Sequence, residues 1–336
     1  MTRLSSLAKR SNGRPRIGVV LGAGGVLGAA WMAGRLVALQ ERLPCPIGAV
    51  DLVVGTSAGG ILAAAVRCGV EVEEIVEHQR GTGLMMLPTL AELDKDGGAL
   101  PRLPRLRIGS PRLLASTALA PHRVHPWVAA SALVLQGRGQ LRSLTTLMGA
   151  LLARDVGLTA SLTWPVRGET WIMAVDYESG RRVAFGRAGA PAVSLPDAVV
   201  ASCSIPGWYE PKVIDGRRYV DGGVRSSTSV DLLTKVDLDE VYVLAPMASY
   251  ETDSPWSPSA RVERFVRRII TNRLTAEVAK VRATGTRVTV FTPGPEDLEA
   301  MGANLMDPAR RRRVLETSLR TSRATVTRRT GSPRAA

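Results

Sequence analysis

The sequence has few of the residues that most enzymes use for acid–base and metal chemistry. Its 336 residues include only three histidines and three cysteines, and the cysteines are Cys45, Cys68 and Cys203. An odd number of cysteines at unrelated spacings excludes a disulfide framework and a cysteine metal site, and it fits a reducing compartment. No apolar run approaches the roughly 18 residues of a membrane span, and the N-terminus lacks the apolar core of a secretory signal. We therefore expect a cytoplasmic protein.

Lysine is also scarce, although the chain is strongly basic. The net charge is +14 and comes from 39 arginines and five lysines against 30 acidic residues. From residue 261 to the end there are 17 basic and 7 acidic residues. Such an end is typical of a surface that binds nucleic acid or an anionic membrane. It is equally typical of a solvated helical face followed by a disordered tail.

What is present is the composition of a folded protein, 45% hydrophobic and 22% charged. Residues 17–21 form an apolar run that ends in glycines, and residues 28–40 follow with a helical pattern. Residues 50–54 and 61–68 repeat the same order of strand, glycine-rich loop and helix. Two such units in succession predict a parallel α/β sheet. Further strands are expected at 171–176, 182–185, 211–214, 217–220, 241–245 and 287–291.

The composition changes along the chain and suggests boundaries. We expect a disordered basic arm over 1–14 and a principal α/β domain over 15–250. A segment rich in leucine, proline and arginine, about 82–150, is interpreted as a helical insertion in that domain. Residues 251–325 are expected to form a basic, helical C-terminal extension, and 326–336 a disordered tail.

The sharpest local motif is Gly55-Thr-Ser-Ala-Gly59, which lies between a predicted strand and a predicted helix. Glycines two residues before and after Ser57 remove the Cβ atoms that would clash in a tight bend, so the bend can expose the hydroxyl. The helix that follows places its N-terminus, with partial positive charge, beneath the serine. The motif indicates a nucleophilic serine, and the alternative is a small-residue turn that packs a helix on a sheet.

A nucleophilic serine needs a base, and the histidines are poorly placed to supply it. The three are His78, His122 and His125, and none follows residue 125 although the predicted strands continue far beyond it. In the usual order of a Ser-Asp-His triad on this kind of sheet, the histidine comes last. The histidines also lack metal-site spacing with cysteine or carboxylates. We therefore expect neither a catalytic histidine nor a metal site.

The base must then be a carboxylate, and Asp221-Gly222-Gly223 stands at the end of a predicted strand. A partly buried aspartate without a local cation has its pKa raised toward that of a working base. The alternative is a simple turn residue, a role that fits Asp215 better because Asp215-Gly216 separates two strands at hairpin spacing. Asp176, at the end of another strand, is interpreted as structural, closing the turn before Gly180.

A third motif is the glycine loop after the first strand, Gly22-Ala-Gly-Gly-Val-Leu-Gly28. Its backbone N–H groups can converge on an anion. A dinucleotide site is one reading, but the spacing is not G-x-G-x-x-G and the next strand does not end in an acid. The other reading is an oxyanion hole in which the N–H groups of Gly24 and Gly25 donate to a tetrahedral intermediate.

Taken in order, the glycine loop, the G-x-S-x-G motif and Asp-Gly-Gly resemble the patatin-like phospholipase family, most closely in the stretch ASCSIPGWYEPKVIDGRRYVDGG. The resemblance implies a Ser–Asp dyad without histidine, with Ser57 as nucleophile and Asp221 as general base. It places the oxyanion hole at the N–H groups of Gly24, Gly25 and Val26. The remaining motif positions are Gly22, Gly28, Gly55, Gly59, Gly222 and Gly223.

The loop departs from the family pattern at two positions. Ala23 replaces the first of three glycines, and Leu27 stands where a basic residue is common. Because the donors are backbone groups, they survive either change. The missing charge bears on recognition of a phosphate headgroup rather than on ester hydrolysis.

The resemblance thus implies a three-layer α/β/α sandwich with a largely parallel central sheet, a helical insertion and a basic helical C-terminal region. It implies a serine lipid acyl hydrolase of phospholipase A, lysophospholipase or esterase type that acts on lipid esters and needs no cofactor. The alternative is an inactive protein of this fold that binds anionic membranes through its arginine-rich regions. No nucleic-acid partner is expected, because no nucleic-acid module is present. The leucines and arginines of the insertion indicate either a cap over the site or a surface that rests at the periphery of an anionic membrane.

Overall fold

The computed structural model describes residues 13–82, 100–156, 164–165, 167–251 and 258–330. The arm over 1–12 and the end over 331–336 lie outside the described residues, as does the first part of the insertion, 83–99. The final helix, α11 (Arg311–Thr330), extends into the segment predicted as a disordered tail. Among the described residues, no helix is both long and apolar enough to cross a membrane.

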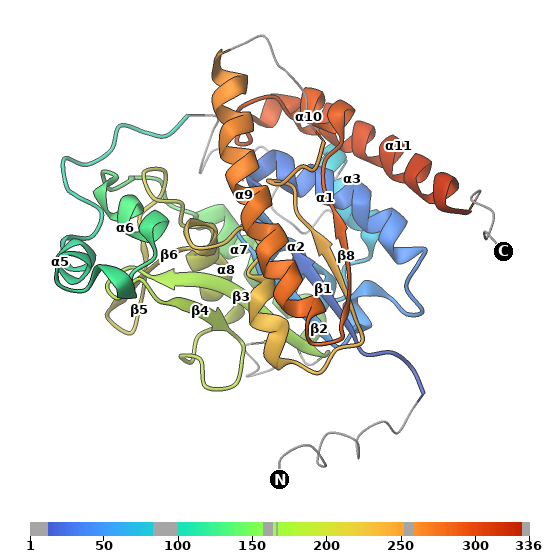
Figure 1. The fold of residues 1–336 in the computed structure, drawn as a ribbon, viewed down its shortest axis with the longest axis horizontal. Coiled ribbons are helices and arrows are strands. Elements are labelled where there is room, and N and C mark those ends of the chain that lie inside the picture. The colour runs from blue at the N-terminus through green and yellow to red at the C-terminus, as the bar shows by residue number, and fades with distance from the viewer. Residues whose placement is uncertain (1–12, 83–99, 157–163, 166, 252–257, 331–336) are drawn as a thin grey trace.

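One sheet organises the described part of the chain, in the order β5-β6-β3-β2-β1-β7-β8, with β4 paired to β3 (Figure 1). Five adjacent strands, with β8 at the edge of the sheet, run parallel to one another. They are β1 (Ile17–Leu21), β2 (Leu52–Thr56), β3 (Glu169–Asp176), β7 (Glu240–Leu244) and β8 (Arg287–Phe291). The antiparallel ones are β4 (Arg182–Phe185), β5 (Lys212–Ile214) and β6 (Arg217–Asp221). The prediction of a largely parallel sheet is therefore confirmed.

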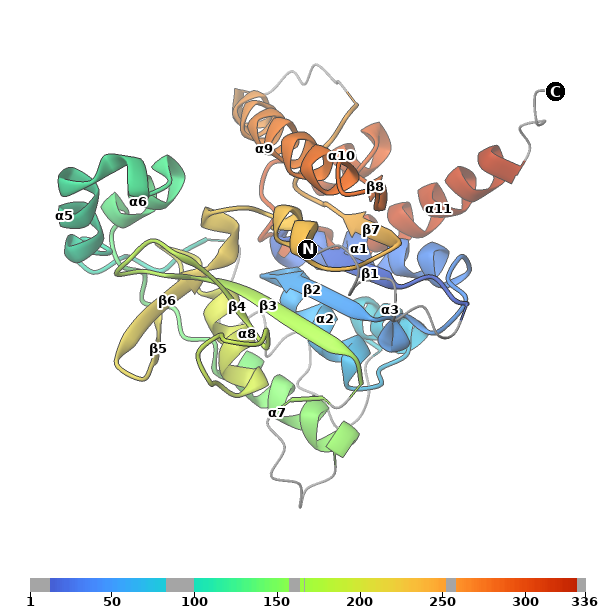
Figure 2. The ribbon, with the colours of Figure 1, turned by 60° about the horizontal axis from the view of Figure 1, so that its bottom comes forward.

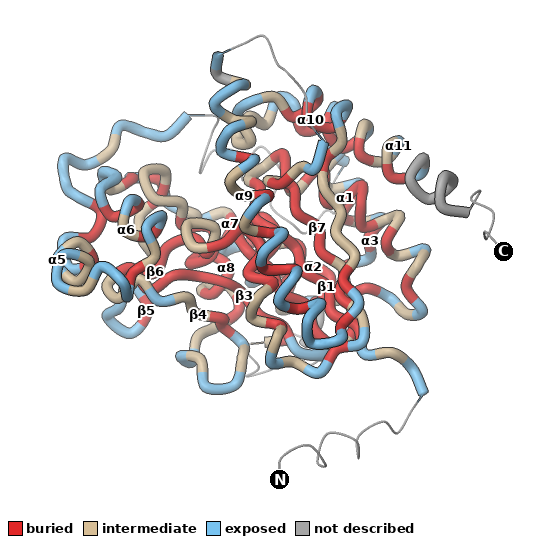
Figure 3. The backbone as a smooth tube through the Cα atoms, in the orientation of Figure 1, coloured by how far each residue is buried: buried red, intermediate tan, exposed pale blue. Residues whose placement is uncertain are grey.

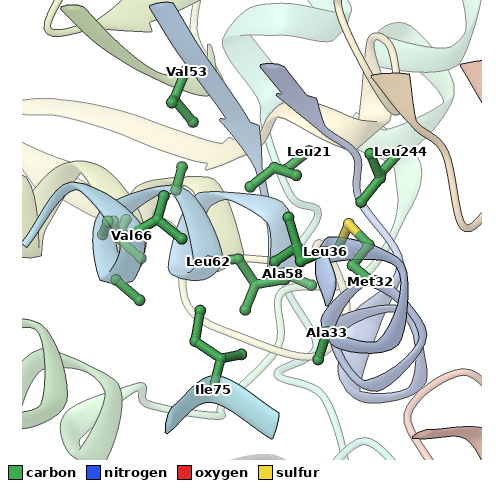
Figure 4. Packing of buried hydrophobic residues seen from close by; sticks show 14 of the residues in the cluster. Leu21, Met32, Ala33, Leu36, Val53, Ala58, Leu62, Val66, Ile75 and Leu244 are labelled. Carbon is green, nitrogen blue, oxygen red and sulfur yellow. The ribbon is translucent and has the colours of Figure 1, made fainter. Parts of the chain in front are cut away.

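Helices cover both faces of the sheet, because successive residues of each buried strand point to opposite sides. On one face Val19 and Leu21 pack in a large apolar cluster with α1 (Gly25–Gln40), α2 (Ala58–Arg67), α3 (Val72–Arg80), α7 (Arg142–Val156), α8 (Leu195–Cys203) and α11. Figure 4 shows part of this cluster around Leu21 and Leu62. On the other face Val20 packs with α9 (Pro258–Arg282) and the short helix η5 (Val230–Lys235). These three layers confirm the predicted sandwich.

The C-terminal region shares this sheet and core. β8 pairs in parallel with β7. α11 lies against α1, and the Ser318 hydroxyl on α11 donates to the Trp31 carbonyl at 2.7 Å. In the sequence, α10 (Pro295–Met301) lies between β8 and α11. Its Asp297 forms a buried ion pair with Arg35 on α1. Residues 258–330 are thus built into the three layers rather than appended to them.

Helices of the insertion form a lobe at one end of the sheet. α5 (Pro111–Leu119) and α6 (Pro126–Leu133) lie together at the left of Figure 1, beyond β6. Their apolar residues pack with Val175, Tyr177 and Val220 at the ends of β3 and β6. The short helix η3 (Pro121–Arg123) connects them. The lobe therefore stands beside the carboxyl end of β3 (Figure 2).

Candidate active site

The sheet register brings the serine motif and the aspartate motif to the same place. Thr56, the last residue of β2, pairs with Met173 on β3, and the next residue of β3, Ala174, pairs with Asp221 on β6. Ser57 directly follows Thr56, so β3 is the common neighbour of both chain ends. This is the carboxyl edge of the parallel strands, where loops of open α/β sheets form their sites.

Ser57 occupies a strained turn between β2 and α2. Its φ of 53° and ψ of −123° lie in a region that L-residues rarely adopt. Although Ser57 is the N-cap residue of α2, its side chain does not cap the helix. The hydroxyl interacts with the carboxyl of Asp221 and with the thiol of Cys203, and it lowers the pKa of both groups. The turn therefore presents the hydroxyl to an acid rather than to the backbone.

The glycines of this motif are required by close packing. A Cβ on Gly55 would lie 2.5 Å from the carbonyl oxygen of Gly59, and a Cβ on Gly59 would overlap the Leu21 carbonyl oxygen at the end of β1. Gly222 is equally constrained, since its Cβ would lie 2.6 Å from the Met173 carbonyl oxygen. These glycines have a structural role, because they allow backbone segments to approach one another closely.

The end of α8 holds both candidate catalytic residues, a role that the sequence did not reveal. The Ser202 hydroxyl accepts a hydrogen bond from the Ser57 N–H at 2.8 Å and donates to the Met173 carbonyl at 2.6 Å. The Ser204 carbonyl accepts the Asp221 N–H at 3.0 Å. Ser-Cys-Ser thus ties the serine turn to the aspartate strand. The sequence signal that could have revealed this role is the position of Ser202 and Ser204 within the stretch that carries the family resemblance.

Asp221 has the environment of a base. Its side chain is 5% exposed, and burial raises the pKa of its carboxyl to about 6, although hydrogen bonds from Ser57 and from the Gly223 N–H at 2.7 Å oppose this shift. No cation contributes to that pKa. The prediction of a raised aspartate pKa is therefore confirmed, and a carboxylate that titrates near 6 is an effective proton acceptor at neutral pH.

Cys203 lies beside Ser57 and Asp221, but its thiol is unreactive. Burial raises the pKa of its thiol well above the ordinary value, and the charge of Asp221 raises it further. The thiol is therefore protonated at neutral pH and is a weak nucleophile. The hydroxyl of Ser57 is the better candidate nucleophile, because the Asp221 carboxylate is available to accept its proton.

The glycine loop lines the same cavities as Ser57 and carries backbone donors. Within the described part of the chain, the N–H groups of Gly24, Gly25 and Val26 have no hydrogen-bond acceptor, whereas Ala23 N–H donates to Ser227 O at 2.7 Å and Leu27 N–H to Leu305 O at 3.0 Å. These donors lie at the N-terminus of α1, where the helix dipole adds partial positive charge. The loop thus has three free donors held between two anchored ones.

Packing explains the two departures of this loop from the family pattern. Leu27 is fully buried in the main apolar cluster, so its side chain does not reach the site. Ala23 is 5% exposed and lines the cavity beside Gly24. Gly24 itself tolerates no side chain, because a Cβ there would lie 2.6 Å from Pro246 and 2.8 Å from the Gly28 Cα.

Two cavities meet at Ser57. The first, about 170 Å³, extends between α2, α3 and α7 and is lined mainly by aliphatic residues, among them Val26, Ile61, Leu62, Val70, Ile75, Leu144, Leu147 and Leu151. The second, about 840 Å³, contains Asp221 and the glycine loop and reaches α9 through Val262, Val266 and Ile270. A substrate carbonyl at Ser57 would therefore have one apolar pocket on one side and a wider space on the other.

Of the three histidines, only His78 lines one of these cavities. His78 on α3 lines the first cavity, and burial lowers its pKa; no hydrogen bond in the described structure joins it to Ser57 or Asp221. His122 is exposed on η3, and His125 caps α6 by accepting the Trp127 N–H. No cluster of three or more potential metal ligands occurs among the described residues.

Asp176 has the structural role that the sequence predicted. Its carboxylate accepts the N–H groups of Glu178 and Ser179, and it pairs with Arg217 at 3.0 Å. Gly180 closes the turn by donating to the Asp176 carbonyl. The Asp176 carboxylate is therefore occupied by hydrogen bonds within the turn and by the ion pair with Arg217, in contrast to the carboxylate of Asp221.

Comparison with known proteins agrees with the sequence motifs. The Patatin-like phospholipase family profile matches residues 19–120 and 172–234, which include both Ser57 and Asp221. Similar solved structures include VipD from Legionella pneumophila, 13% identical with a TM-score of 0.45, and the type III effector ExoU, 17% identical with a TM-score of 0.38. Human GIVD cytosolic phospholipase A2 is 14% identical with a TM-score of 0.38.

These alignments cover 94%, 95% and 93% of this chain, and 67%, 54% and 58% of VipD, ExoU and the human phospholipase respectively. The chain therefore corresponds to only part of each of these larger proteins. The matched family segments contain all three motifs of the site, from the glycine loop to Asp-Gly-Gly. The chain belongs to the patatin-like phospholipase family.

Proposed function

We propose that the chain is a serine lipid acyl hydrolase that cleaves carboxylic ester bonds of lipids through a Ser57–Asp221 dyad. One observation carries the proposal: Ser57 and Asp221, whose buried carboxyl has a pKa of about 6, line the same cavity, and a second cavity meets it at Ser57. A serine in a strained turn beside such a base has both the exposure and the proton acceptor that nucleophilic catalysis needs.

In the proposed reaction, Asp221 accepts the proton of the Ser57 hydroxyl as the serine oxygen attacks the ester carbonyl. The free N–H groups of Gly24, Gly25 and Val26 donate to the oxyanion, and each such donor contributes roughly 3 kcal/mol to transition-state stabilisation. Protonated Asp221 then supplies the proton to the departing alcohol, which leaves an acyl group on Ser57. Water, deprotonated by Asp221, then attacks the acyl group; the fatty acid leaves, and the proton returns from Asp221 to the Ser57 oxygen.

The two cavities suggest how a lipid ester lies at this site. The aliphatic lining of the first cavity fits an acyl chain, since apolar pockets favour apolar ligand segments. The second cavity then receives the alcohol part of the ester. Because Leu27 offers no charge there, the contacts support a lipid ester class rather than a particular headgroup.

A panel of phospholipids, lysophospholipids and neutral esters, with released fatty acids measured by mass spectrometry, tests the proposed activity. We expect fatty acid release from at least one class by the wild-type protein. If no class is hydrolysed and no acyl-enzyme forms, the alternative of an inactive protein that binds anionic membranes replaces the enzyme.

The dependence of the rate on pH tests the role of Asp221. Since the ionised carboxylate is the base and its pKa is raised to about 6, kcat/KM for a non-ionising ester should rise about tenfold per pH unit below 6 and level off above it. A profile that is flat from pH 4 to 8, or that bends near pH 4, would show that Asp221 in this environment is not the base.

Replacement of the three histidines tests the dyad in a second way. We expect the variant His78→Gln, His122→Gln, His125→Asn to retain activity within about tenfold, because a lost general base typically costs 10²–10⁴-fold. Asparagine preserves the cap that His125 provides to α6. A loss of several orders of magnitude in a folded variant, judged by circular dichroism, would return the base role to a histidine.

A further inference from the structure

The leucines of residues 100–108 face solvent, whereas Leu144 and Leu147 of the same insertion are buried and line the first cavity. Leu100, Leu103 and Leu106 are 77%, 85% and 97% exposed, and Ile108 is 44% exposed. A cap closed over the cavities would bury such side chains. Figure 3 shows this stretch, which leads to α5, as largely exposed. For residues 100–108, of the two roles that the sequence left open, exposure favours a surface that contacts something outside the chain.

The exposed strip, residues 100–108, is connected to the wall of a cavity that leads to the candidate site. Ile108 bridges to Leu135, and the Gly109 N–H donates to the Val134 carbonyl at 3.0 Å. Val134 and Trp127, 41% and 49% exposed, line a third cavity whose opposite wall is α9. The third and second cavities share Ile205, Gly223, Val224, Val266 and Ile270, so they form one continuous entrance toward Ser57.

The strip, with Trp127 and Val134, forms one lip of this entrance, and the N-terminal half of α9 forms the other. Val262, Phe265 and Val266 are 64%, 66% and 39% exposed, and their spacing places them on one face of the helix. Val262 and Val266 line the second cavity directly. Both lips therefore expose large apolar side chains outward at the opening that leads to the candidate nucleophile.

Basic residues predominate around these lips, where Glu210 is paired with Arg105 and Glu263 with Arg264 and Arg267. Residues 97–154 contain eight arginines and no acidic residue. In the strip, Arg102 and Arg107 are exposed beside the leucines, and on α9 Arg268 is exposed next to the apolar face. Apolar side chains set among arginines are the surface type that inserts at an anionic bilayer. A second copy of this chain is a poor occupant, because an interface of this surface with itself would bring arginines together.

We propose that this entrance rim, formed by Leu103, Leu106, Trp127, Val134, Val262 and Phe265, docks on the surface of an anionic lipid bilayer. The apolar side chains enter the headgroup boundary and the arginines contact lipid phosphates. The second cavity then opens toward the bilayer, so a lipid ester reaches Ser57 without crossing water. The delivery of a lipid ester to Ser57 rests on the proposed function, whereas the docking on a bilayer rests on the exposed rim residues alone.

Binding is tested with the full chain carrying Ser57→Ala, so that no lipid is consumed. Sedimentation with vesicles of phosphatidylcholine containing about one quarter phosphatidylglycerol should show binding that weakens as salt rises, and binding to pure phosphatidylcholine should be weaker. The double variant Leu106→Ser, Phe265→Ser should bind at least about tenfold more weakly. Neither residue lines a cavity.

The matched control is Val213→Ser on β5, since Val213 is 58% exposed but lies outside the rim. It should bind vesicles within about twofold of the parent. Vesicle binding by the double variant equal to that of the control would overturn the proposal. A concentration-dependent dimer that the double variant disrupts, without vesicle binding by the parent, would overturn it in favour of a protein interface.

A soluble short-chain ester separates this inference from the proposed function. With Ser57 intact, the double variant should hydrolyse that ester like wild type but lose hydrolysis of vesicle lipid. If wild type hydrolyses no ester while the vesicle-binding differences hold, the rim proposal stands and the enzyme proposal fails. If hydrolysis of vesicle lipid is unaffected in the double variant, the rim proposal fails alone.

Discussion

Ser57→Ala should reduce ester hydrolysis by on the order of 10⁴-fold or more, because it removes the attacking oxygen while leaving both cavities open. The residual rate would come from substrate binding and the backbone donors of the glycine loop. Alanine has the volume of serine without the hydroxyl, and the N–H of residue 57 still has Ser202 as its acceptor. The folded structure is therefore expected to persist, and initial rates with a soluble ester measure the loss.

The control for this change is another buried serine outside the site. Ser318 on α11 is fully buried and donates to the Trp31 carbonyl, but it lines none of the three cavities. Ser318→Ala should lower stability by about 1 kcal/mol and leave the rate within about twofold of wild type. Equal rates for Ser57→Ala and Ser318→Ala would remove Ser57 from the chemistry.

Asp221→Asn should abolish turnover to a similar extent and at the same time stabilise the fold. The amide accepts the Gly223 N–H as the carboxylate does, but it cannot take the serine proton. Burial raises the pKa of Asp221 from its ordinary value to about 6, which means that its ionised form destabilises the folded state at neutral pH. Removing the charge relieves up to about 3 kcal/mol.

The sign of this effect depends on pH. At pH 4 Asp221 is protonated in the folded state and about half protonated in the unfolded state, whose pKa is near 3.8, so the free energies of unfolding of the variant and the wild type should differ by less than about 1 kcal/mol. Between pH 4 and 6 the wild type loses stability relative to the variant, and above 6 the difference is constant. Urea unfolding at pH 4 and pH 8 measures it. An inactive variant with no gain in stability at pH 8 would contradict the environment assigned to this carboxylate.

Asp176→Asn is the matched control. Its carboxylate is as buried as that of Asp221 but is bound to two backbone N–H groups and to Arg217. Substitution should therefore lower stability, the reverse of Asp221→Asn, with activity within about tenfold of wild type. The opposite signs distinguish a carboxylate kept for structure from one kept for chemistry.

Local pattern was sufficient to predict most of the elements around the site. β1 and β8 begin and end where apolar runs predicted them, and the Asp215-Gly216 turn joins β5 to β6 with Asp215 at a φ of 47°. Such features depend on neighbouring residues alone, through alternation and turn chemistry. The candidate nucleophile was recognisable for the same reason, because its turn lies within five residues.

The supports of the site were not predictable in this way. Ser202 accepts the N–H of a residue 145 positions away, and the Ser227 carbonyl holds Ala23 across the sheet. Contacts of this kind depend on which strands become neighbours, and no local periodicity records that. The local sequence around Asp221 also did not decide whether this residue is a structural turn residue or a general base. The family resemblance selected the base, and the register of β6 against β3 gives the geometric reason.

The most direct test of the dyad is to trap the nucleophile and identify it. The native protein is reacted with a fluorophosphonate, and the modified residue is located by tandem mass spectrometry. The account predicts one rapid adduct on Ser57, absent in Ser57→Ala and much slower in Asp221→Asn. An adduct on Cys203 or on another serine, or equally rapid labelling of Asp221→Asn, would contradict a Ser57 nucleophile activated by Asp221.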